Sequence, residues 1–290
     1  MPKIAILGAN GFLGLPIANA FEAKDWEVIA LSHNKKPESF RQEILADLFD
    51  EATLETALSQ TKPDVVLSTA WDTEHGKFWT NESNVGYRDA TLKFAELSFQ
   101  AGVETFIGLG TMSEYGISPG FCNADLTPLV SNDIYSKSKI ETGLELKKIG
   151  EAFGRQTHWA RVFQAFGPNE KSERYVPGLI ANLRRGNGFS IRTPNFEMDW
   201  IHTADVASAI VFMLENELGH FVDIGSGTGT TVKELSELIC EEFELDPTLL
   251  DYSGQIPGHE KKAVVHQGSK LLAHGWKPAE SLRNRIKSLR

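Results

Sequence analysis

The chain has 290 residues, of which 41% are hydrophobic and 23% are charged, and its formal net charge at pH 7 is −10. This composition is that of an ordinary globular protein. The negative charge argues against nucleic acid as a partner, because binding to a phosphate backbone needs a basic surface. No apolar run approaches the roughly 20 residues that cross a bilayer, so we expect no membrane partner and a cytoplasmic location. The two cysteines, Cys122 and Cys240, are too few to indicate a disulfide framework or a metal site.

The first half of the chain alternates short apolar runs with amphipathic stretches. Five runs have the length and composition of buried strands, namely Lys3–Leu7, Trp26–Leu31, Asp64–Leu67, Thr105–Leu109 and His158–Phe163. Three stretches have helical periodicity, namely Gly14–Ala23, Arg88–Gln100 and Tyr135–Phe153. This alternation predicts an α/β fold of Rossmann type, in which a doubly wound parallel sheet carries helices on both faces.

The alternation loosens after Gly167 and Pro168. The elements expected there are helices near Tyr175–Arg185 and Asp205–Leu214, a strand at Phe221–Ile224, and a helix opened by the capping box Thr231–Glu234. We therefore predict a dinucleotide-binding domain over residues 1–166 and a smaller C-terminal substrate-binding lobe over residues 167–290. Some segments of this lobe are expected to return to the first domain. Ligands of open α/β sheets bind at the carboxyl ends of the strands, so we expect the lobe to lie over that edge.

A glycine-rich turn joins the first predicted strand to the first predicted helix. Glycines let the backbone approach a pyrophosphate closely, and the helix N-terminus supplies N–H donors and a positive dipole. The strand–turn–helix context makes the pattern a specific signal for a dinucleotide. Cofactor contacts are expected from Gly8, Asn10, Gly11, Phe12, Leu13 and Gly14.

The end of the second strand bears on the choice between NAD and NADP. NAD usually calls for an acidic residue about 20 residues beyond the glycines, where it binds the ribose hydroxyls. The residues found at this position are Ser32, His33, Asn34, Lys35 and Lys36. NADP is favoured, because no acid is present to repel a 2′-phosphate and two lysines are near; NAD stays open if the lysines are only solvated loop charges. Asp47 and Leu48 are expected near the adenine with either cofactor.

Tyr135 and Lys139 lie four residues apart in a predicted helix, so both project from the same face. A tyrosine near its reference pKa of about 10 is a poor acid or base at neutral pH. A neighbouring ammonium favours the phenolate and lowers that pKa, and the lysine can also hold the ribose of the cofactor. The pair is a candidate catalytic centre, although the same spacing occurs by chance on many helices.

Three motifs, in this order and spacing, resemble the signatures of the extended short-chain dehydrogenases/reductases, the NAD-dependent epimerase/dehydratase family. They are the turn Gly8–Gly14, the run Thr111-Met112-Ser113-Glu114-Tyr115-Gly116, and the pair Tyr135 and Lys139. Further similarity at residues 161–168, 199–206, 223–227 and 275–278 extends the resemblance over nearly the whole chain. In that family hydride passes between the nicotinamide and a carbon that bears oxygen.

The resemblance implies a role for each matching residue. Tyr135 exchanges the proton, Thr111 orients the reacting oxygen, and Lys139 tunes Tyr135. Ala70 and Phe163 join the cofactor contacts. The implied substrate contacts are Trp71, Thr111, Ser113, Gln164, Arg174 and Val176. Core packing is an equal alternative for Trp71. The resemblance also implies a homodimer formed by the helices expected at 88–100 and 135–153, and it implies no metal.

Within this family the chain resembles the reductases of nucleotide-linked 4-keto sugars. Dehydratases carry an Asp-Glu pair directly after the catalytic threonine, whereas this chain has Met112 and Ser113 there. We therefore predict an NAD(P)H-dependent reductase of a nucleotide-sugar ketone. Two alternatives stay open: a nucleotide-sugar 4-epimerase with tightly bound NAD, and a non-catalytic dinucleotide-binding sensor on the same fold.

Two departures from the family pattern concern the substrate diphosphate. Arginine is common just before Asp199 and before a later Pro-Gly pair, whereas this chain has Met198 and Ile256 at those positions. Arg174 is among the basic residues that can replace them. The departures leave a substrate without a diphosphate as a further alternative.

Overall fold

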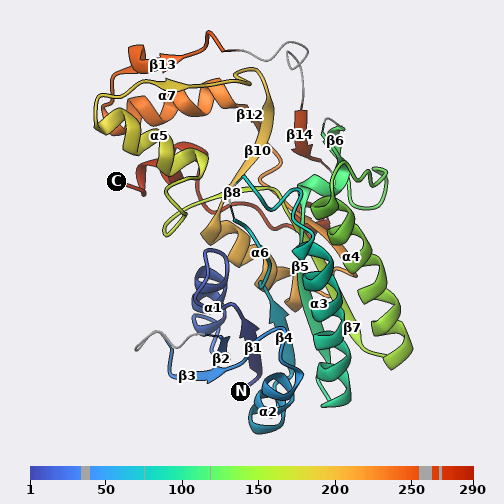
Figure 1. The fold of residues 1–290 in the computed structure, drawn as a ribbon. Coiled ribbons are helices and arrows are strands. Elements are labelled where there is room, and N and C mark those ends of the chain that lie inside the picture. Colours follow the sequence, from blue (N-terminus) through green and yellow to red (C-terminus); the bar gives the residue numbers. More distant parts are fainter. Residues whose placement is uncertain (34–39, 75, 118, 255–262, 268–269) are drawn as a thin grey trace.

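The computed structural model describes residues 1–290 apart from 34–39, 75, 118, 255–262 and 268–269 (Figure 1). Its larger lobe is built on a seven-stranded sheet of order β11-β7-β5-β4-β1-β2-β3, in which all neighbouring strands are parallel. The strands are β1 (Lys3–Leu7), β2 (Glu27–Ser32), β3 (Gln42–Leu45), β4 (Val65–Ser68), β5 (Thr105–Thr111), β7 (Gln156–Val162) and β11 (Phe221–Ile224). This arrangement confirms the predicted α/β fold of Rossmann type.

The order of the strands reverses between β1 and β4. The chain first builds β1, β2 and β3 outward on one side, and then returns to build the other side from β4. In open α/β sheets, ligands bind beyond the carboxyl ends of the strands at such a switch point. The glycine-rich turn follows β1, and Thr111 ends β5, so both lie at this edge of the sheet.

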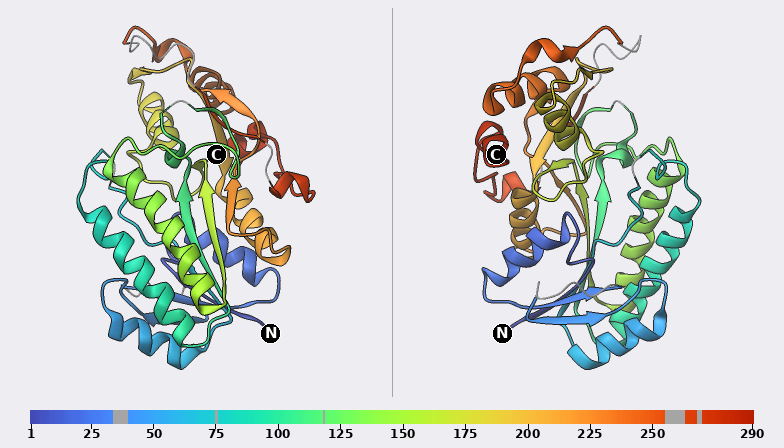
Figure 2. Two further views of the ribbon diagram at one scale, coloured as in Figure 1. Left: turned by 90° about the vertical axis from the view of Figure 1, so that its right-hand side faces the viewer. Right: turned by 60° about the vertical axis from the view of Figure 1, so that its left-hand side comes forward.

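Helices cover both faces of the parallel sheet (Figure 2). One face carries α1 (Gly14–Glu22) and α6 (Thr203–Glu215), and the other carries α2 (Glu51–Thr61), α3 (Ser83–Gln100) and α4 (Ile134–Phe153). Successive side chains of a strand point to opposite faces. Accordingly, Ile4 and Ile6 of β1 join the core beneath α1, whereas Ala5 and Leu7 join the core on the α3 side. Burial of both faces explains the nearly continuous apolar sequences of these strands.

The smaller lobe lies over the carboxyl edge of this sheet (Figure 1). It contains a second sheet of order β12-β10-β14-β6, with β8 also paired to β10, and the two-stranded pair β13-β9. Its strands are β6 (Gly120–Cys122), β8 (Gln164–Phe166), β9 (Phe189–Ser190), β10 (Glu197–His202), β12 (Gly229–Thr231), β13 (Leu250–Asp251) and β14 (Ala263–His266). Its helical segments are α5 (Tyr175–Arg184), α7 (Val232–Phe243), η2 (Pro247–Leu249) and α9 (Leu282–Lys287). The short helix α8 (Lys270–Ala273) instead packs against β11 and α6, and its Leu271 joins the core of the larger lobe. In the described part of the chain no helix is both long and apolar enough to cross a membrane.

The structure differs from the sequence predictions mainly at helix starts and in short strands. The helix α3 begins at Ser83 rather than at Arg88. Its first turn is held by the fully buried Asn84, whose Nδ2 donates to the carbonyl oxygens of Phe78 and Asn81 at 2.7 Å each. Such polar contacts leave no apolar periodicity in the sequence, so the pattern does not reveal this turn.

Candidate active site

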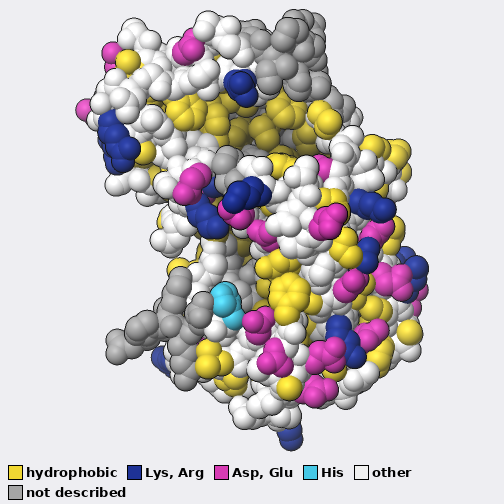
Figure 3. All heavy atoms as spheres, in the orientation of Figure 1, with side chains coloured by type: hydrophobic (Ala, Val, Ile, Leu, Met, Phe, Trp, Pro, Cys, Tyr) yellow, Lys and Arg dark blue, Asp and Glu magenta, His cyan; other side chains and the backbone are white. Residues whose placement is uncertain are grey.

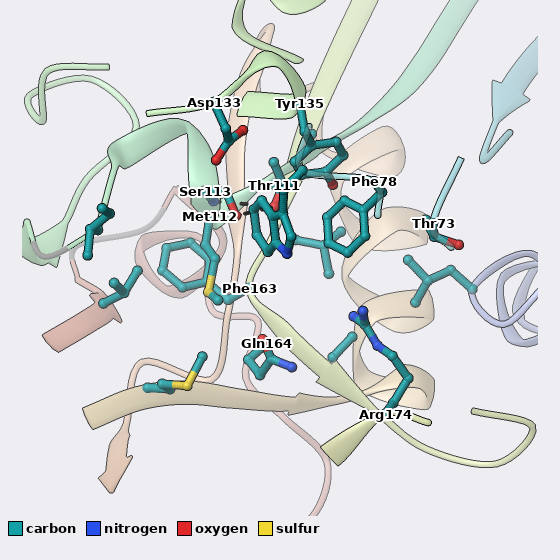
Figure 4. Close-up of a pocket in the computed structure, with 18 of the residues that line it drawn as sticks. Thr73, Phe78, Thr111, Met112, Ser113, Asp133, Tyr135, Phe163, Gln164 and Arg174 are labelled. Carbon is teal, nitrogen blue, oxygen red and sulfur yellow. Dashed lines mark hydrogen bonds between the residues drawn. The ribbon is translucent and has the colours of Figure 1, made fainter. Parts of the chain in front are cut away.

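A cavity of about 560 Å³ lies between the two lobes, beyond the carboxyl ends of β5 and β7. The face drawn in Figure 3 is hollowed between the lobes, and hydrophobic side chains gather on the smaller lobe above this hollow. Apolar side chains that line the cavity are Phe78, Trp79, Met112, Phe163, Phe196 and Met198. Polar side chains that line it are Thr111, Ser113, Asp133, Tyr135, Gln164 and Arg174 (Figure 4). A concave, largely apolar site with a few convergent polar groups is typical of small-molecule binding.

The turn between β1 and α1 has the geometry of a phosphate-binding loop. Gly8 adopts a φ of 85°, and a Cβ atom at Gly14 would clash with the carbonyl group of Gly8. Glycine therefore lets the turn fold directly onto the start of α1. No side chain caps α1. The Leu15 N–H donates to the Gly11 carbonyl oxygen at 3.1 Å, so the Gly14 N–H at the start of the helix is the one that can serve an external acceptor. Because Phe12 and Leu13 also line the cavity, the turn fits the pyrophosphate of a dinucleotide whose reactive end reaches the cavity.

Thr111 is the last residue of β5 and the N-cap of the 3-10 helix η1 (Met112–Tyr115). Its Oγ1 accepts a hydrogen bond from the Ser113 N–H at 3.3 Å. The Glu114 carboxylate accepts one from the Thr111 N–H at 2.9 Å. This capping box ties the end of the strand to the fully buried Glu114, and it leaves the Thr111 side chain at the cavity beside Tyr135 (Figure 4).

Tyr135 lies in the first turn of α4, which Asp133 caps by accepting a hydrogen bond from the Ser136 N–H at 2.7 Å. Phe78 and Trp79 stand edge-on to its ring, with centroid distances of 4.9 and 5.4 Å. Burial raises the pKa of Tyr135 to about 12 and outweighs the opposite effect of its hydrogen bond with Thr111. The phenol therefore holds its proton at neutral pH, which suits it to donate that proton.

Lys139 lies one helical turn beyond Tyr135 and is 5% exposed. Its Nζ donates to the carbonyl oxygen of Leu109 at 2.7 Å and lies 3.6 Å from the centroid of the Trp71 ring. Burial lowers the pKa of Lys139 to about 7, and Glu114 offsets part of that effect. The sequence predicts that Lys139 lowers the pKa of Tyr135. In the polypeptide itself burial dominates instead, and the pKa of Tyr135 is raised.

Tyr115 belongs to a buried network behind the cavity. Its hydroxyl contacts both carboxylate oxygens of Asp223, at 2.7 and 2.8 Å, and accepts a hydrogen bond from Arg161 Nη1 at 3.2 Å. Arg161 also donates from Nε to Glu114 at 2.6 Å. Burial raises the pKa values of both Tyr115 and Asp223. The network joins η1, β7 and β11. Within the motif, Thr111, Met112 and Ser113 therefore line the cavity, whereas Glu114 and Tyr115 support them from behind.

Four of the predicted substrate contacts line the cavity: Thr111, Ser113, Gln164 and Arg174. Arg174 is the N-cap residue of α5, and Figure 4 shows its side chain directed toward the space between Gln164 and Phe78. The side chain of Arg174 is one-third exposed, so its guanidinium stays available to an anionic ligand.

Trp71 and Val176, the other two predicted substrate contacts, are not among the residues that line this cavity. Val176 is 2% exposed and lies in the core of the smaller lobe, because the apolar face of α5 packs toward α7. Trp71 donates from Nε1 to Asn84 Oδ1 at 2.8 Å. The indole ring lies over the Lys139 ammonium of α4, with Nζ 3.6 Å from the ring centroid.

Glu170 is a cavity residue that sequence reasoning missed. Its side chain is 5% exposed, and its Oε1 lies 3.9 Å from Arg174 Nε. Its Oε2 is buried and has no hydrogen-bond partner within the described residues. Burial raises the pKa of Glu170 to about 7. A single acid in a loop gives no signal in the sequence, because its burial depends on how the smaller lobe folds over it.

A second missed residue is Glu43 of β3, which reaches the end of β2. Its Oε1 accepts a hydrogen bond from Ser32 Oγ at 2.7 Å and one from Asn10 Nδ2 at 3.1 Å. The usual motif places an acid at the end of the second strand, where Ser32 stands. The acid comes instead from the neighbouring strand, and only the pairing of β2 with β3 brings it there.

The other predicted cofactor contacts lie around the same edge of the sheet. Phe163 is 3% exposed and lines the cavity, and Ala70 follows β4. Leu48 is buried in the core on the α2 side, whereas the Asp47 carboxylate accepts a hydrogen bond from the Phe49 N–H at 2.9 Å. His33 is exposed. Asn34 and Lys35, together with Lys36 and Ile256, lie outside the described residues.

Comparison with known proteins decides the family. The model of the NAD dependent epimerase/dehydratase family matches residues 4–225. The chain belongs to this family. Its matched part contains the glycine-rich turn, Thr111, Tyr135 and Lys139, so the resemblance inferred from the sequence is confirmed. Members of this family are enzymes of the short-chain dehydrogenase/reductase type.

Relatives in the NAD dependent epimerase/dehydratase family match this chain over nearly its full length. UDP-glucose 4-epimerase of Rhizobium meliloti (strain 1021) is 24% identical over 309 residues, which cover 97% of this chain and 93% of the relative. The dTDP-6-deoxy-L-talose 4-dehydrogenase (NAD(P)(+)) of Kitasatospora kifunensis is 23% identical over 304 residues, covering 99% and 94%. The solved UDP-N-acetylglucosamine 4-epimerase from Methanobrevibacter ruminantium M1, in complex with UDP-N-acetylmuramic acid, has the same fold. Its TM-score is 0.85 at 22% identity, with 99% of this chain and 96% of that chain covered.

Proposed function

We propose that this enzyme reduces a keto group of a nucleotide-activated sugar, with a nicotinamide dinucleotide as the source of hydride. The observation that carries this proposal is the pair of hydroxyls from Thr111 and Tyr135 at the cavity, with the phosphate-binding turn beside it. When bound, the cofactor supplies the hydride. The polypeptide supplies the proton, the orientation of the substrate oxygen and the exclusion of water.

Thr111 and Tyr135 present two hydroxyl groups to one oxygen atom of the substrate. Thr111 orients the carbonyl oxygen by donating a hydrogen bond, and Tyr135 transfers its phenolic proton to that oxygen as the carbon accepts hydride. Because burial raises the pKa of Tyr135 to about 12, the phenol carries the proton that the reduction requires before the reaction begins. Phe78 and Trp79 shield the phenol from solvent.

Lys139 acts from the side of the cofactor. Its ammonium has three N–H donors, and one of them donates to the Leu109 carbonyl oxygen. The remaining donors can hold ribose hydroxyls. Burial lowers the pKa of Lys139 to about 7, so protonated and neutral forms are both present near neutral pH. Lys139 can thereby return a proton toward Tyr135 after each turnover.

Arg174 and Gln164 are the residues we assign to the nucleotide sugar. Met198 lies on the cavity wall at a position where the family often has arginine, so a diphosphate needs another cation. The Arg174 guanidinium can form a two-point contact with phosphate oxygens, and the Gln164 amide can donate a hydrogen bond. Nucleotide sugars appear in the names of the relatives and of the molecule bound in the solved structure, which supports this substrate class.

A nucleotide-sugar 4-epimerase is the second candidate. It is favoured by the similarity to UDP-glucose 4-epimerase over 97% of this chain. Thr111 and Tyr135 would serve both reactions, because an epimerase passes through the same ketone. The two differ in the fate of the cofactor: an epimerase regenerates it within each turnover, whereas a reductase consumes it.

The test is consumption of NADH and NADPH by the purified protein with a panel of nucleotide-linked 4-keto-6-deoxy sugars. We expect turnover with at least one sugar, and Tyr135→Phe should lower kcat by at least about 100-fold because the proton donor is lost. Cofactor affinity should change little in this variant.

A fully active Tyr135→Phe variant would contradict the assigned mechanism. Isomerisation of a UDP-sugar without cofactor consumption would establish the epimerase. If the protein binds the cofactor but consumes none of it with any sugar of the panel, the result would point to a sensor or to a substrate without a diphosphate.

A further inference from the structure

The end of β2 is the place where a dinucleotide-binding fold distinguishes NAD from NADP. In this fold the hydroxyls of the adenosine ribose lie beyond the carboxyl end of the second strand, where an acidic residue usually accepts their hydrogen bonds. Here β2 ends at Ser32, whose neutral hydroxyl neither repels a phosphate nor supplies a charged acceptor. Judged from this strand alone, the chain has no preference for NAD.

The structure brings a carboxylate to this point from the neighbouring strand. β3 runs parallel to β2, with Ala30 opposite Glu43. The half-buried Glu43 side chain extends to Ser32, whose Oγ donates to Oε1 at 2.7 Å. The same oxygen accepts a hydrogen bond from Nδ2 of Asn10 at 3.1 Å. One carboxylate oxygen is thus fixed between the phosphate-binding turn and the end of β2.

These two hydrogen bonds hold the charge between the two segments that adjoin the expected ribose position. Asn10 belongs to the turn that holds the pyrophosphate, and Ser32 marks the strand end that adjoins the ribose. A carboxylate accepts hydrogen bonds only, so it complements the two donor hydroxyls of an unmodified ribose. A 2′-phosphate carries close to two negative charges at neutral pH and would meet a like charge in a partly buried site, where repulsion is weakly screened.

We infer that Glu43 is the residue that determines cofactor specificity and that it makes the enzyme prefer NAD(H) to NADP(H). This reverses the preference expected from the sequence, which rested on the lack of an acid after the second strand. The inference rests on dinucleotide binding as proposed above, and it is independent of the identity of the sugar. Lys35 and Lys36 lie outside the described residues.

The test is direct titration of the full-length protein with NADH and with NADPH, without any sugar substrate, followed by nucleotide fluorescence. The wild-type protein should bind NADH at least about tenfold more tightly than NADPH. In Glu43→Gln the affinity for NADPH should rise, so that the ratio falls to about threefold or less. Glu27→Gln is the matched control, because Glu27 starts the same strand β2 and pairs with Lys3 at 3.6 Å, at the opposite edge of the sheet. It should keep the wild-type ratio.

A double variant guards against a purely structural effect. Adding Ser32→Asp to Glu43→Gln places an acid at the end of β2 itself and should restore the preference for NADH. A wild-type protein that binds NADPH as tightly as NADH would overturn the inference. Because this comparison of the two affinities uses the wild-type protein, it tests the inference even if Glu43→Gln fails to fold. An unchanged ratio in a folded Glu43→Gln variant would overturn it as well. If neither dinucleotide binds, the proposed function fails together with the inference, and the two failures are thus distinguishable.

Discussion

At the residue scale, Tyr135 and Lys139 show how burial alone prepares a pair of groups for proton transfer. Removal from water disfavours the charged form of each group, so it raises the pKa of the phenol to about 12 and lowers the pKa of the ammonium to about 7. Both residues are therefore biased toward neutral forms, in which the proton sits on Tyr135. That distribution suits a reductase, whose catalytic tyrosine must begin each turnover protonated.

The buried carboxyl group of Glu170 should make the stability of the folded protein depend on pH. Burial raises its pKa in the folded state to about 7 from a reference of 4.5, so the folded protein holds this proton more tightly than the unfolded chain. Its favourable contribution is complete below the pKa of the unfolded state and is lost as the pH rises through about 7. We therefore expect Glu170→Gln to raise the free energy of unfolding by about 3 kcal/mol at pH 8 and to leave it nearly unchanged near pH 4.5.

Urea denaturation of the two proteins across this pH range measures the effect. Glu173→Gln is the control, because Glu173 lies in the same segment but is exposed. An equal pH dependence in wild type and Glu170→Gln would show that Glu170 is ionised in the folded protein at all these pH values, and the raised pKa would then be wrong.

At the scale of elements, a buried polar network holds the end of β5 that carries Thr111. Glu114 of η1 accepts hydrogen bonds from Trp159 Nε1 at 3.0 Å and Arg161 Nε at 2.6 Å, both on β7. The Arg161 side chain is 2% exposed and that of Glu114 is fully buried. Such a network fixes relative positions because each member is costly to leave unpaired. It is the means by which Thr111 is held at the cavity.

Replacement of Glu114 should therefore destabilise the protein strongly. Glu114→Gln removes the carboxylate that Arg161 Nε contacts and leaves the buried guanidinium with Asp223 alone, 4.0 Å from Nη1, which costs up to about 3–5 kcal/mol. The exposed pair of Glu145 and Lys148, at 2.7 Å, supplies the control, since Glu145→Gln should cost almost nothing. Urea denaturation of both variants compares them directly. A Glu114→Gln variant as stable as Glu145→Gln would show that the network is not needed to support β5.

The elements show which parts of the fold local sequence determines. β1 has the predicted bounds Lys3–Leu7, and the capping box at Thr231 and Glu234 opens α7 as expected, because periodicity and capping act within a few residues. The helix α2 and the strands of two to four residues in the smaller lobe have no comparable signal. Their pairing, such as that of β14 with β6, depends on segments far apart in the chain.

The candidate site divides in the same way. The turn, Thr111 and the pair on α4 are contiguous motifs, so the sequence is sufficient to find them. Glu43 and Glu170 act through contacts with residues that only the fold brings near, and neither has a motif around it. Trp71 shows the converse: an aromatic residue at the right point of the chain is turned by its hydrogen bond with Asn84 away from the cavity.

At the scale of the whole molecule, both lobes contribute residues to the cavity. The parallel sheet presents the turn after β1 and the end of β5. The smaller lobe, which lies over that edge of the sheet (Figure 1), adds Arg174, Phe196 and Met198 to the cavity lining. The chain carries a net charge of −10, and its proposed ligands are anionic. Binding therefore depends on local donors, the N-terminus of α1 and Arg174, rather than on the overall field.

The most direct test of the proposed reduction is transfer of deuterium from NADH labelled at the reactive position of the nicotinamide to a nucleotide-linked 4-keto sugar, followed by mass spectrometry of the product. We expect one deuterium for each sugar reduced by the wild-type protein and almost no labelled product from Tyr135→Phe under the same conditions. A sugar that changes configuration without gaining deuterium, or a Tyr135→Phe variant that labels the product as fast as wild type, would contradict the proposed reaction.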